Sequence, residues 1–291
     1  MNRDDFDSLM PPRAFSRRAF VRTSLGSGFA AAVLPIAAQT AIRTPSDGLI
    51  AGEVSIPVGD FKMPAYRAAP RGVRHAPVVL VVSEIFGVHE HIADVARRFA
   101  QRGYFAVAPE LFARYGDPMA YGEISKLVAE VVSKAGDAQV MADLDATVDW
   151  AGHQGAAVDK TGITGFCWGG RIVWLYAAHN PTLKAAVAWY GRLEGPVSSL
   201  NPAQPIQLVD QLKAPTLGLY GGADPGIPMR SVAAMQDALA TGSTAARASR
   251  LVVFADAPHA FHADYRPSYR EAAAKEGWQR GIDWFRQHGV A

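Results

Sequence analysis

Along most of the chain, short apolar runs alternate with segments of helical periodicity, and this alternation limits the possible fold more than any other sequence feature. The clearest run is Pro77–Val82, whose continuous β-branched residues are expected of a strand buried on both faces. We predict further strands at 104–108, 161–164, 185–190, 216–220 and 250–254. We predict helices at 91–102, 121–134, 138–154, 168–179, 229–240 and 268–288. Strands that alternate with helices predict a parallel sheet covered by helices on both faces.

These elements are expected to form a single domain. A loosely alternating segment at 53–68, with turn residues Gly59 and Asp60, predicts a hairpin before the first buried strand. The chain has no internal repeat, and the Pro-containing segment 201–205 is interpreted as a loop rather than a domain boundary. With 49% hydrophobic and 19% charged residues, the composition is globular. We therefore predict one α/β domain over residues 45–291.

The charge balance gives no reason to expect a nucleic-acid partner. The formal net charge is +2, from 29 basic and 27 acidic residues. Five of the arginines and three of the aspartates lie in residues 1–41, which leaves 24 residues of each sign in the rest of the chain. A balanced surface does not steer a polyanion. The single cysteine, Cys167, excludes an internal disulfide and is either an inert buried residue or a reactive thiol.

Residues 1–41 resemble a twin-arginine export signal. The pair Arg17-Arg18 is followed by Phe20 and by a mildly apolar, glycine-containing run at 24–38. This run is shorter than the about 20 apolar residues that span a bilayer, so no stable membrane span is expected after cleavage. We predict recognition by the twin-arginine export machinery and a periplasmic or secreted location. An uncleaved anchor or a disordered basic tail is the alternative.

The sequence Gly165-Phe166-Cys167-Trp168-Gly169-Gly170 follows a predicted strand and opens a predicted helix. It has the form of the G-x-S-x-G nucleophile elbow, with cysteine in place of serine. The glycines are needed because side chains two residues either side of the nucleophile would collide. The helix N-terminus next to the sulfur favours a thiolate and, later, an oxyanion. We therefore predict Cys167 as a nucleophile.

Two further residues complete a predicted catalytic triad. In α/β-hydrolases the acid and then the histidine follow the nucleophile, each after a late strand. Asp224 lies in the loop Gly221–Pro228 after the strand predicted at 216–220, and His259 follows the strand predicted at 250–254. The alternative for Asp224 alone is an ordinary turn aspartate. The alternative for His259 alone is a solvent-facing loop histidine.

With these residues in place, the chain resembles the dienelactone hydrolase (carboxymethylenebutenolidase) family from about Val54 to Phe285. The resemblance rests on the elbow, on the Gly-Gly-Ala-Asp and Pro-His-Ala-Phe segments, and on two further motifs, Ser83-Glu84-Ile85-Phe86-Gly87-Val88 and Ala108-Pro109-Glu110-Leu111-Phe112-Ala113-Arg114. It implies an α/β-hydrolase fold, with a mostly parallel central sheet and helices on both faces. It also implies hydrolysis of activated esters or lactones through a cysteine thioester, with no cofactor.

The resemblance also implies roles for residues outside the triad. In the family, the glutamate corresponding to Glu84 contacts the resting cysteine and takes part in forming the thiolate when substrate binds. A carboxylate near the sulfur disfavours premature ionisation. The backbone N–H groups of Ile85 and Trp168 are expected to form the oxyanion hole.

The sequence departs from the family pattern where dienelactone hydrolases hold a substrate carboxylate with two arginines. The position four residues after His259 is Ala263, and residues 116–151 contain no arginine, only Lys126 and Lys134. We therefore predict a preference for neutral substrates. Alternative sources of positive charge are Arg114, Arg192 and Arg266. Residues that could line the substrate site are Tyr115, Tyr121 and His262.

The sequence also allows two other functions. A periplasmic thiol redox sensor is the first alternative, although the chain has no second cysteine to resolve an oxidised Cys167. A non-catalytic binding member of the fold is the second. The sequence His89-Glu90-His91 is not interpreted as a metal site, because histidines two residues apart do not share a helical face. Arg97 and Arg98 are expected on a solvated helix face.

Overall fold

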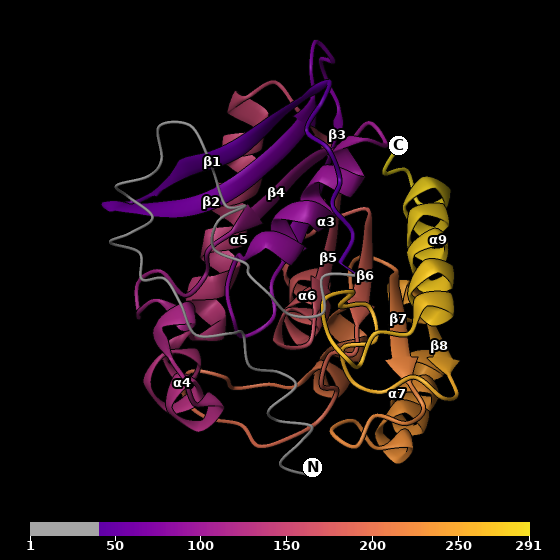
Figure 1. The fold of residues 1–291 in the computed structure, drawn as a ribbon. Coiled ribbons are helices and arrows are strands. Elements are labelled where there is room, and N and C mark those ends of the chain that lie inside the picture. Colours follow the sequence, from indigo (N-terminus) through magenta and orange to yellow (C-terminus); the bar gives the residue numbers. More distant parts are fainter. Residues whose placement is uncertain (1–40) are drawn as a thin grey trace.

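A computed structural model describes residues 41–291, so the predicted export signal lies outside the described residues except for Ala41 (Figure 1). The described chain forms an eight-stranded sheet in the order β1-β2-β4-β3-β5-β6-β7-β8. The strands are β1 (Leu49–Val58), β2 (Phe61–Pro70), β3 (Pro77–Val82), β4 (Phe105–Pro109), β5 (Ala157–Phe166), β6 (Ala185–Trp189), β7 (Thr216–Gly221) and β8 (Arg250–Phe254). The β1–β2 and β2–β4 pairs are antiparallel and the other pairs are parallel. The predicted hairpin is β1–β2, and the prediction of a mostly parallel sheet is confirmed.

Helices cover both faces of the sheet (Figure 1). The α-helices are α3 (Glu90–Ala100), α4 (Ile124–Glu130), α5 (Asp137–His153), α6 (Trp168–His179), α7 (Met229–Thr241), α8 (Thr244–Ala248) and α9 (Glu271–Gln287). On one face α3 and α9 pack together, because Phe99 of α3 contacts Trp278 and Phe285 of α9. On the other face Arg171 of α6 forms an ion pair with Asp137 of α5. The predicted α/β architecture is therefore confirmed.

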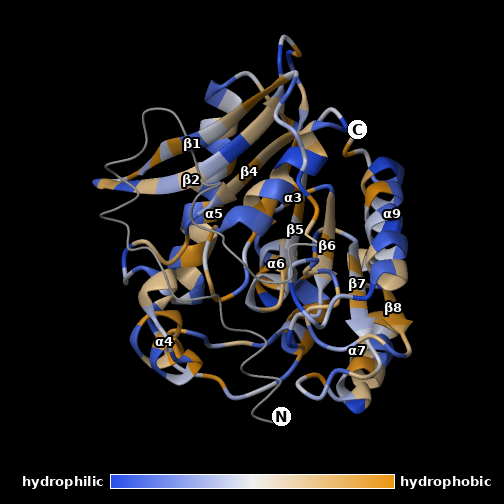
Figure 2. Ribbon diagram, viewed as in Figure 1, coloured by the Kyte–Doolittle hydropathy of each residue, from blue (hydrophilic) through white to orange (hydrophobic). Residues whose placement is uncertain are grey.

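The core lies between the sheet and these helices. The apolar run of β3 is buried, and Val78 to Val82 have no exposed surface. Figure 2 shows apolar residues along β4, β5 and β6 and a polar outer surface on α9. Gly277 of α9 allows close packing on β6, because a Cβ there would lie 2.7 Å from the ring of Trp189. The amphipathic pattern of this last helix thus fixes it against the sheet.

Two predicted elements differ from the structure. The helix predicted at 121–134 is wrong: α4 ends at Glu130, and Val131 leaves the helical conformation (φ −126°, ψ −63°) before a 3₁₀ turn at Val132–Lys134. Val131 is fully buried, so its packing in the core competes with helix continuation. The strand predicted at 161–164 is part of the ten-residue β5, whose first four residues are partly or fully exposed and lack a continuous apolar run. The short elements η4 (Pro205–Gln211) and α8 were not predicted.

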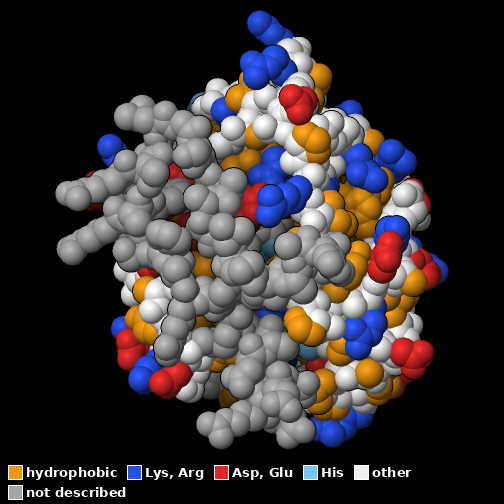
Figure 3. All heavy atoms as spheres, in the orientation of Figure 1, with side chains coloured by type: hydrophobic (Ala, Val, Ile, Leu, Met, Phe, Trp, Pro, Cys, Tyr) orange, Lys and Arg blue, Asp and Glu red, His pale blue; other side chains and the backbone are white. Residues whose placement is uncertain are grey.

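The visible face of the described residues mixes acidic, basic and apolar side chains, without one sign of charge covering a whole side (Figure 3). In the part of the chain from residue 41 onward, no helix is both long enough and apolar enough to cross a membrane. The parallel strands point the same way, so the loops after β3, β5, β6 and β7 meet at the carboxyl edge of the sheet. In open α/β sheets this edge is where ligands bind.

Candidate active site

Cys167 lies at the turn between β5 and α6. Its backbone has φ 55° and ψ −113°, which is strained for a residue with a side chain. The Cys167 N–H donates to the carbonyl of Trp189 at 3.0 Å, which holds the turn against β6. A Cβ on Gly165 would lie 2.5 Å from the Gly169 carbonyl oxygen, so the predicted need for glycine on both sides of the cysteine is confirmed. The elbow therefore presents the sulfur at the N-terminus of α6.

His259 and Asp224 lie in adjacent loops and are hydrogen-bonded to each other. Nδ1 of His259 is 2.6 Å from Oδ2 of Asp224, while Oδ1 of Asp224 accepts the Gly226 N–H at 2.8 Å. The Ala223 N–H donates to the Ala257 carbonyl at 3.1 Å. A Cβ on Gly221 would lie 2.2 Å from that carbonyl oxygen, which explains why the Asp224 loop begins with glycine. The two loops can approach closely only because this position lacks a side chain.

The imidazole of His259 interacts with both other predicted triad members. Burial alone would lower its pKa, but the negative charge of Cys167 and hydrogen bonds to Asp224 and Cys167 outweigh burial and raise its pKa to about 10. Because Nδ1 faces Asp224, Nε2 is the nitrogen that is left for the cysteine. The structure thus brings Cys167, His259 and Asp224 together at the carboxyl edge of the sheet.

The two N–H groups expected to form the oxyanion hole lie on neighbouring segments. Neither the Ile85 N–H nor the Trp168 N–H donates to another residue within 41–291. Trp168 is the first residue of α6, where N–H groups have no partner inside the helix. A Cβ on Gly169 would lie 2.5 Å from the Ser83 carbonyl oxygen, so the start of α6 packs directly on the end of β3. The oxyanion hole formed by these two N–H groups stays a prediction.

Glu110 positions the loop that carries Ile85. Its Oε2 accepts the Val88 N–H at 2.7 Å, and its Oε1 lies 3.4 Å from the Phe112 nitrogen. Gly87 adopts φ 73°, and a Cβ there would lie 2.5 Å from the Glu110 carboxylate. The two motifs that support the family resemblance therefore contact each other, which the sequence alone did not show.

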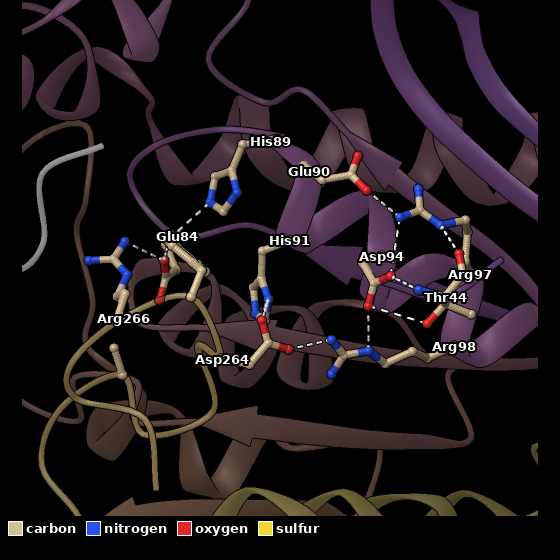
Figure 4. Close-up of polar contacts among 12 residues, drawn as sticks. Thr44, Glu84, His89, Glu90, His91, Asp94, Arg97, Arg98, Asp264 and Arg266 are labelled. Carbon is tan, nitrogen blue, oxygen red and sulfur yellow. Dashed lines mark hydrogen bonds and ion pairs between the residues drawn. The ribbon is translucent and has the colours of Figure 1, made fainter. Parts of the chain in front are cut away.

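Glu84 is buried and paired with residues from the loop after β8 (Figure 4). Its Oε2 accepts from Arg266 Nη2 at 3.0 Å and lies 3.4 Å from the Tyr265 hydroxyl. Burial would raise the pKa of Glu84, but the charge of Arg266, together with nearby histidines, lowers it below its ordinary value. Within residues 41–291, no hydrogen bond or ion pair joins Glu84 to Cys167. The contact with the resting cysteine that the family resemblance implies thus stays a prediction.

The arginines considered for substrate binding already have partners or lie outside the core. Ala263 is fully buried, and Arg266 has Glu84 as its carboxylate partner. Arg114 forms an ion pair with Asp143 at 2.7 Å and stacks on a phenylalanine ring. Arg192 is exposed. The described residues therefore offer no paired arginine clamp beside Cys167.

The histidines near α3 belong to a buried polar network (Figure 4). Nδ1 of His91 is 3.3 Å from Oδ1 of Asp264, which also contacts Arg98. Arg98 is 2.6 Å from Asp94, so the prediction of a solvated helix face for Arg97 and Arg98 is wrong. Within residues 41–291, no three or more His, Cys, Asp or Glu side chains are grouped to hold a metal ion.

His262 is part of the aromatic core. It is 2% exposed, and its ring lies near those of Trp189 and Trp278. Sequence reasoning also missed the roles of three consecutive residues, Asp264, Tyr265 and Arg266. Asp264 contacts His91 and Arg98 of α3. Tyr265 and Arg266 contact Glu84 and so join it to the loop after β8. The only sequence signal was a cluster of polar residues shortly after His259.

The eight-stranded sheet, the elbow at Cys167 and the adjacent His259–Asp224 pair define the chain as an α/β-hydrolase. The sequence model of the dienelactone hydrolase family matches residues 63–289. The chain belongs to the dienelactone hydrolase family.

Known relatives agree with this assignment. The chain is 57% identical over 288 residues to a Methylorubrum extorquens protein named "Putative carboxymethylenebutenolidase", covering 99% of this chain and 98% of that protein. It is 53% identical to an Escherichia coli K12 protein of the same name, covering 92% and 97%. A crystal structure of a "Putative Dienelactone Hydrolase" from Klebsiella pneumoniae has 55% identity and a TM-score of 0.79, covering 82% of this chain and 99% of that one. The chain is therefore a hydrolase.

Proposed function

We propose that this enzyme cleaves activated, neutral esters or lactones through a thioester on Cys167. The observation that carries the proposal is the contact of 2.6 Å between His259 Nδ1 and Asp224 Oδ2, on the far side of an imidazole that interacts with Cys167. This is the order of nucleophile, base and orienting acid that covalent ester hydrolysis requires.

The proposed reaction has two steps. With the thiol proton held by His259, the Cys167 sulfur attacks the substrate carbonyl, whose oxygen becomes negative and accepts from the N–H groups of Ile85 and Trp168. The C–O bond to the alcohol breaks, His259 donates its proton to the departing oxygen, and a thioester remains. His259 then takes a proton from water, and the hydroxide attacks the thioester. The Cys167 sulfur leaves as the thiolate while His259 keeps the proton, which restores the starting state. Asp224 holds the imidazole orientation in both steps.

The substrate class follows from the nucleophile and from the charges near it. A thiolate is a good nucleophile and also a good leaving group, so it suits enol lactones and activated esters better than amides. The ion pairs Arg266–Glu84 and Arg114–Asp143 neutralise two guanidinium groups that were considered as carboxylate ligands, the first buried and the second half-buried. A substrate carboxylate would therefore enter the site without a dedicated partner, which supports neutral substrates.

A panel of lactones and aryl esters assayed with the purified protein tests the proposal. Turnover that disappears when Cys167 is alkylated, and that is absent in Cys167→Ala, is the expected result. Turnover that survives both treatments would contradict the proposed nucleophile. Reversible sulfenylation of Cys167 without turnover of any ester would favour the redox-sensor alternative.

A further inference from the structure

Tyr190 is the direct neighbour of Cys167 at the carboxyl edge of the sheet. The parallel strands β5 and β6 are in register up to the pair Phe166–Trp189, where both strands end. The residues that follow them directly are Cys167 after β5 and Tyr190 after β6. Both residues have a positive φ, 55° for Cys167 and 38° for Tyr190. Such values are uncommon for residues with side chains and gather at functional sites. The strained nucleophile therefore has a strained tyrosine beside it.

The conformation of Tyr190 is fixed by close packing against α6. A Cβ on Gly191 would lie 2.3 Å from the Gly170 backbone, and a Cβ on Gly170 would lie 2.4 Å from the Trp189 carbonyl oxygen. The Tyr190 N–H donates to the Leu219 carbonyl at 2.8 Å. The turn after β6 thus has no room to relax, and a strained conformation persists only when its surroundings determine it in this way.

The hydroxyl of Tyr190 is buried without a partner. Tyr190 is 1% exposed, and its oxygen makes no hydrogen bond to any residue in the described chain. The equally buried Tyr220 shows the usual arrangement, because its hydroxyl accepts from Trp174 Nε1 at 3.1 Å. Buried hydroxyl groups in folded proteins nearly always have a partner, and no residue of the described chain takes the donor capacity of this one.

The ring of Tyr190 lies beside one of the proposed reacting groups. The ring of Tyr190 packs edge-on against the ring of His259, with centroids 5.1 Å apart. Burial, followed by the negative charges of Glu84 and Cys167, raises the pKa of Tyr190 well above its ordinary value. The phenol therefore stays protonated and can donate a hydrogen bond at any pH at which the enzyme works.

We propose that Tyr190 is a catalytic residue whose hydroxyl donates a hydrogen bond to an oxygen in the acyl portion of the substrate. The inference rests on the proposed function, which already assigns the other oxygens. The carbonyl oxygen faces Ile85 and Trp168, and the departing oxygen takes its proton from His259. The acyl portion becomes attached to Cys167, next to Tyr190. The site is thus selective for esters and lactones that carry an acceptor oxygen near the scissile carbonyl.

The test compares two aryl esters with the same leaving group, a methoxyacetate and the matching butyrate, in which a methylene replaces the ether oxygen. The variant Tyr190→Phe removes only the hydroxyl. We expect kcat/KM for the methoxyacetate to fall about tenfold, as for the loss of one hydrogen bond, while kcat/KM for the butyrate changes less than about twofold. The measured quantity is the ratio of the two values in each variant, which cancels the different intrinsic reactivity of the esters.

Tyr220→Phe is the matched control, because it removes a buried hydroxyl that has a partner outside the site. It should lower Tm and leave the ratio unchanged, whereas Tyr190→Phe should keep or raise Tm, since it removes an unsatisfied polar group. An unchanged ratio in an active Tyr190→Phe enzyme would overturn the inference and leave the proposed function intact. Failure of the wild-type enzyme to hydrolyse either ester would instead overturn the proposed function.

Discussion

Arg266 Nη2 lies 3.0 Å from Glu84 Oε2, and both side chains are almost completely buried, at 2% and 3% exposure. The guanidinium also lies over the ring of Phe86, 4.9 Å from its centroid. This ion pair joins the segment after β3, which carries Ile85, to the loop after β8, which carries His259. The charge of Arg266 is thereby balanced within the protein.

Arg266→Ala is expected to lower the free energy of unfolding by about 3–5 kcal/mol, because it leaves the buried carboxylate of Glu84 without its partner. Chemical denaturation measures the change. The double variant Glu84→Gln with Arg266→Met removes both charges and should recover a large part of the loss. A single variant as stable as the wild type would show that the ion pair is not formed in solution.

The balanced charge of Arg266 also leads to a prediction about substrate choice. The kcat/KM for a neutral activated ester or lactone should exceed that for a matched anionic dienelactone by about tenfold or more, equivalent to about 1.4 kcal/mol in transition-state stabilisation. A buried anion without a partner is costly. Steady-state kinetics on the matched pair provides the measurement. A clear preference for the anion would contradict it, and alanine substitutions at Arg114, Arg192 and Arg266 would then locate the ligand.

The pH dependence of His259 is a third prediction. Its folded-state pKa of about 10 lies above the ordinary value of 6.5, so the stability from charged His259 is fully present below about pH 6.5. This stability is lost as the pH rises through about 10. Cys167→Ala removes the charge and hydrogen bond that raise the pKa, so the loss should occur at lower pH. NMR titration of the His259 ring measures its pKa in the wild type and in Cys167→Ala. Identical titration midpoints in the two proteins would exclude an interaction between His259 and Cys167.

Short-range patterns in the sequence were enough to predict the α/β fold and the three candidate triad residues. The β-branched run of β3 and the glycines around Cys167 impose their structure locally, through burial on both faces and through steric limits at a tight turn. The helix break at Val131 was not predictable in this way, because it depends on where that side chain packs.

Other features of the site depend on contacts between distant segments. Glu84 and Arg266 are 182 positions apart, and no periodic pattern connects them. The strain at Tyr190 arises from the packing of Gly191 on Gly170, which appears only when β6 and α6 are assembled. Sequence patterns named residues that chemistry requires, but not the residues that hold them in place.

Export is a fourth prediction, and it concerns residues outside the described part of the chain. The double variant Arg17→Lys with Arg18→Lys should hold the precursor in the cytoplasm, because the resemblance to a twin-arginine signal rests on that pair. Cell fractionation followed by immunoblotting compares the variant with the wild type. The single substitution Arg13→Lys, outside the pair, is the matched control and should be exported. Unchanged localisation of the double variant would contradict the twin-arginine interpretation.

Substitution of the nucleophile is the fifth prediction. Cys167→Ala should fold normally and lose all but about 1% of ester turnover, or less, since no other nucleophile lies at the elbow. Cys167→Ser should also fold but act much more slowly on lactones, because a hydroxyl ionises far less readily than a thiol. Steady-state assays, with circular dichroism as the folding control, measure both. Equal activity of the serine variant would contradict a thiolate mechanism.

The most direct measurement is mass spectrometry of the enzyme quenched with acid during turnover of an activated ester. We predict a mass increase equal to the acyl group, located on the peptide that contains Cys167 and absent from Cys167→Ala. The adduct should form and decay at rates at least as fast as turnover. Continued turnover without an adduct on Cys167, or with an adduct on another residue, would contradict the thioester mechanism.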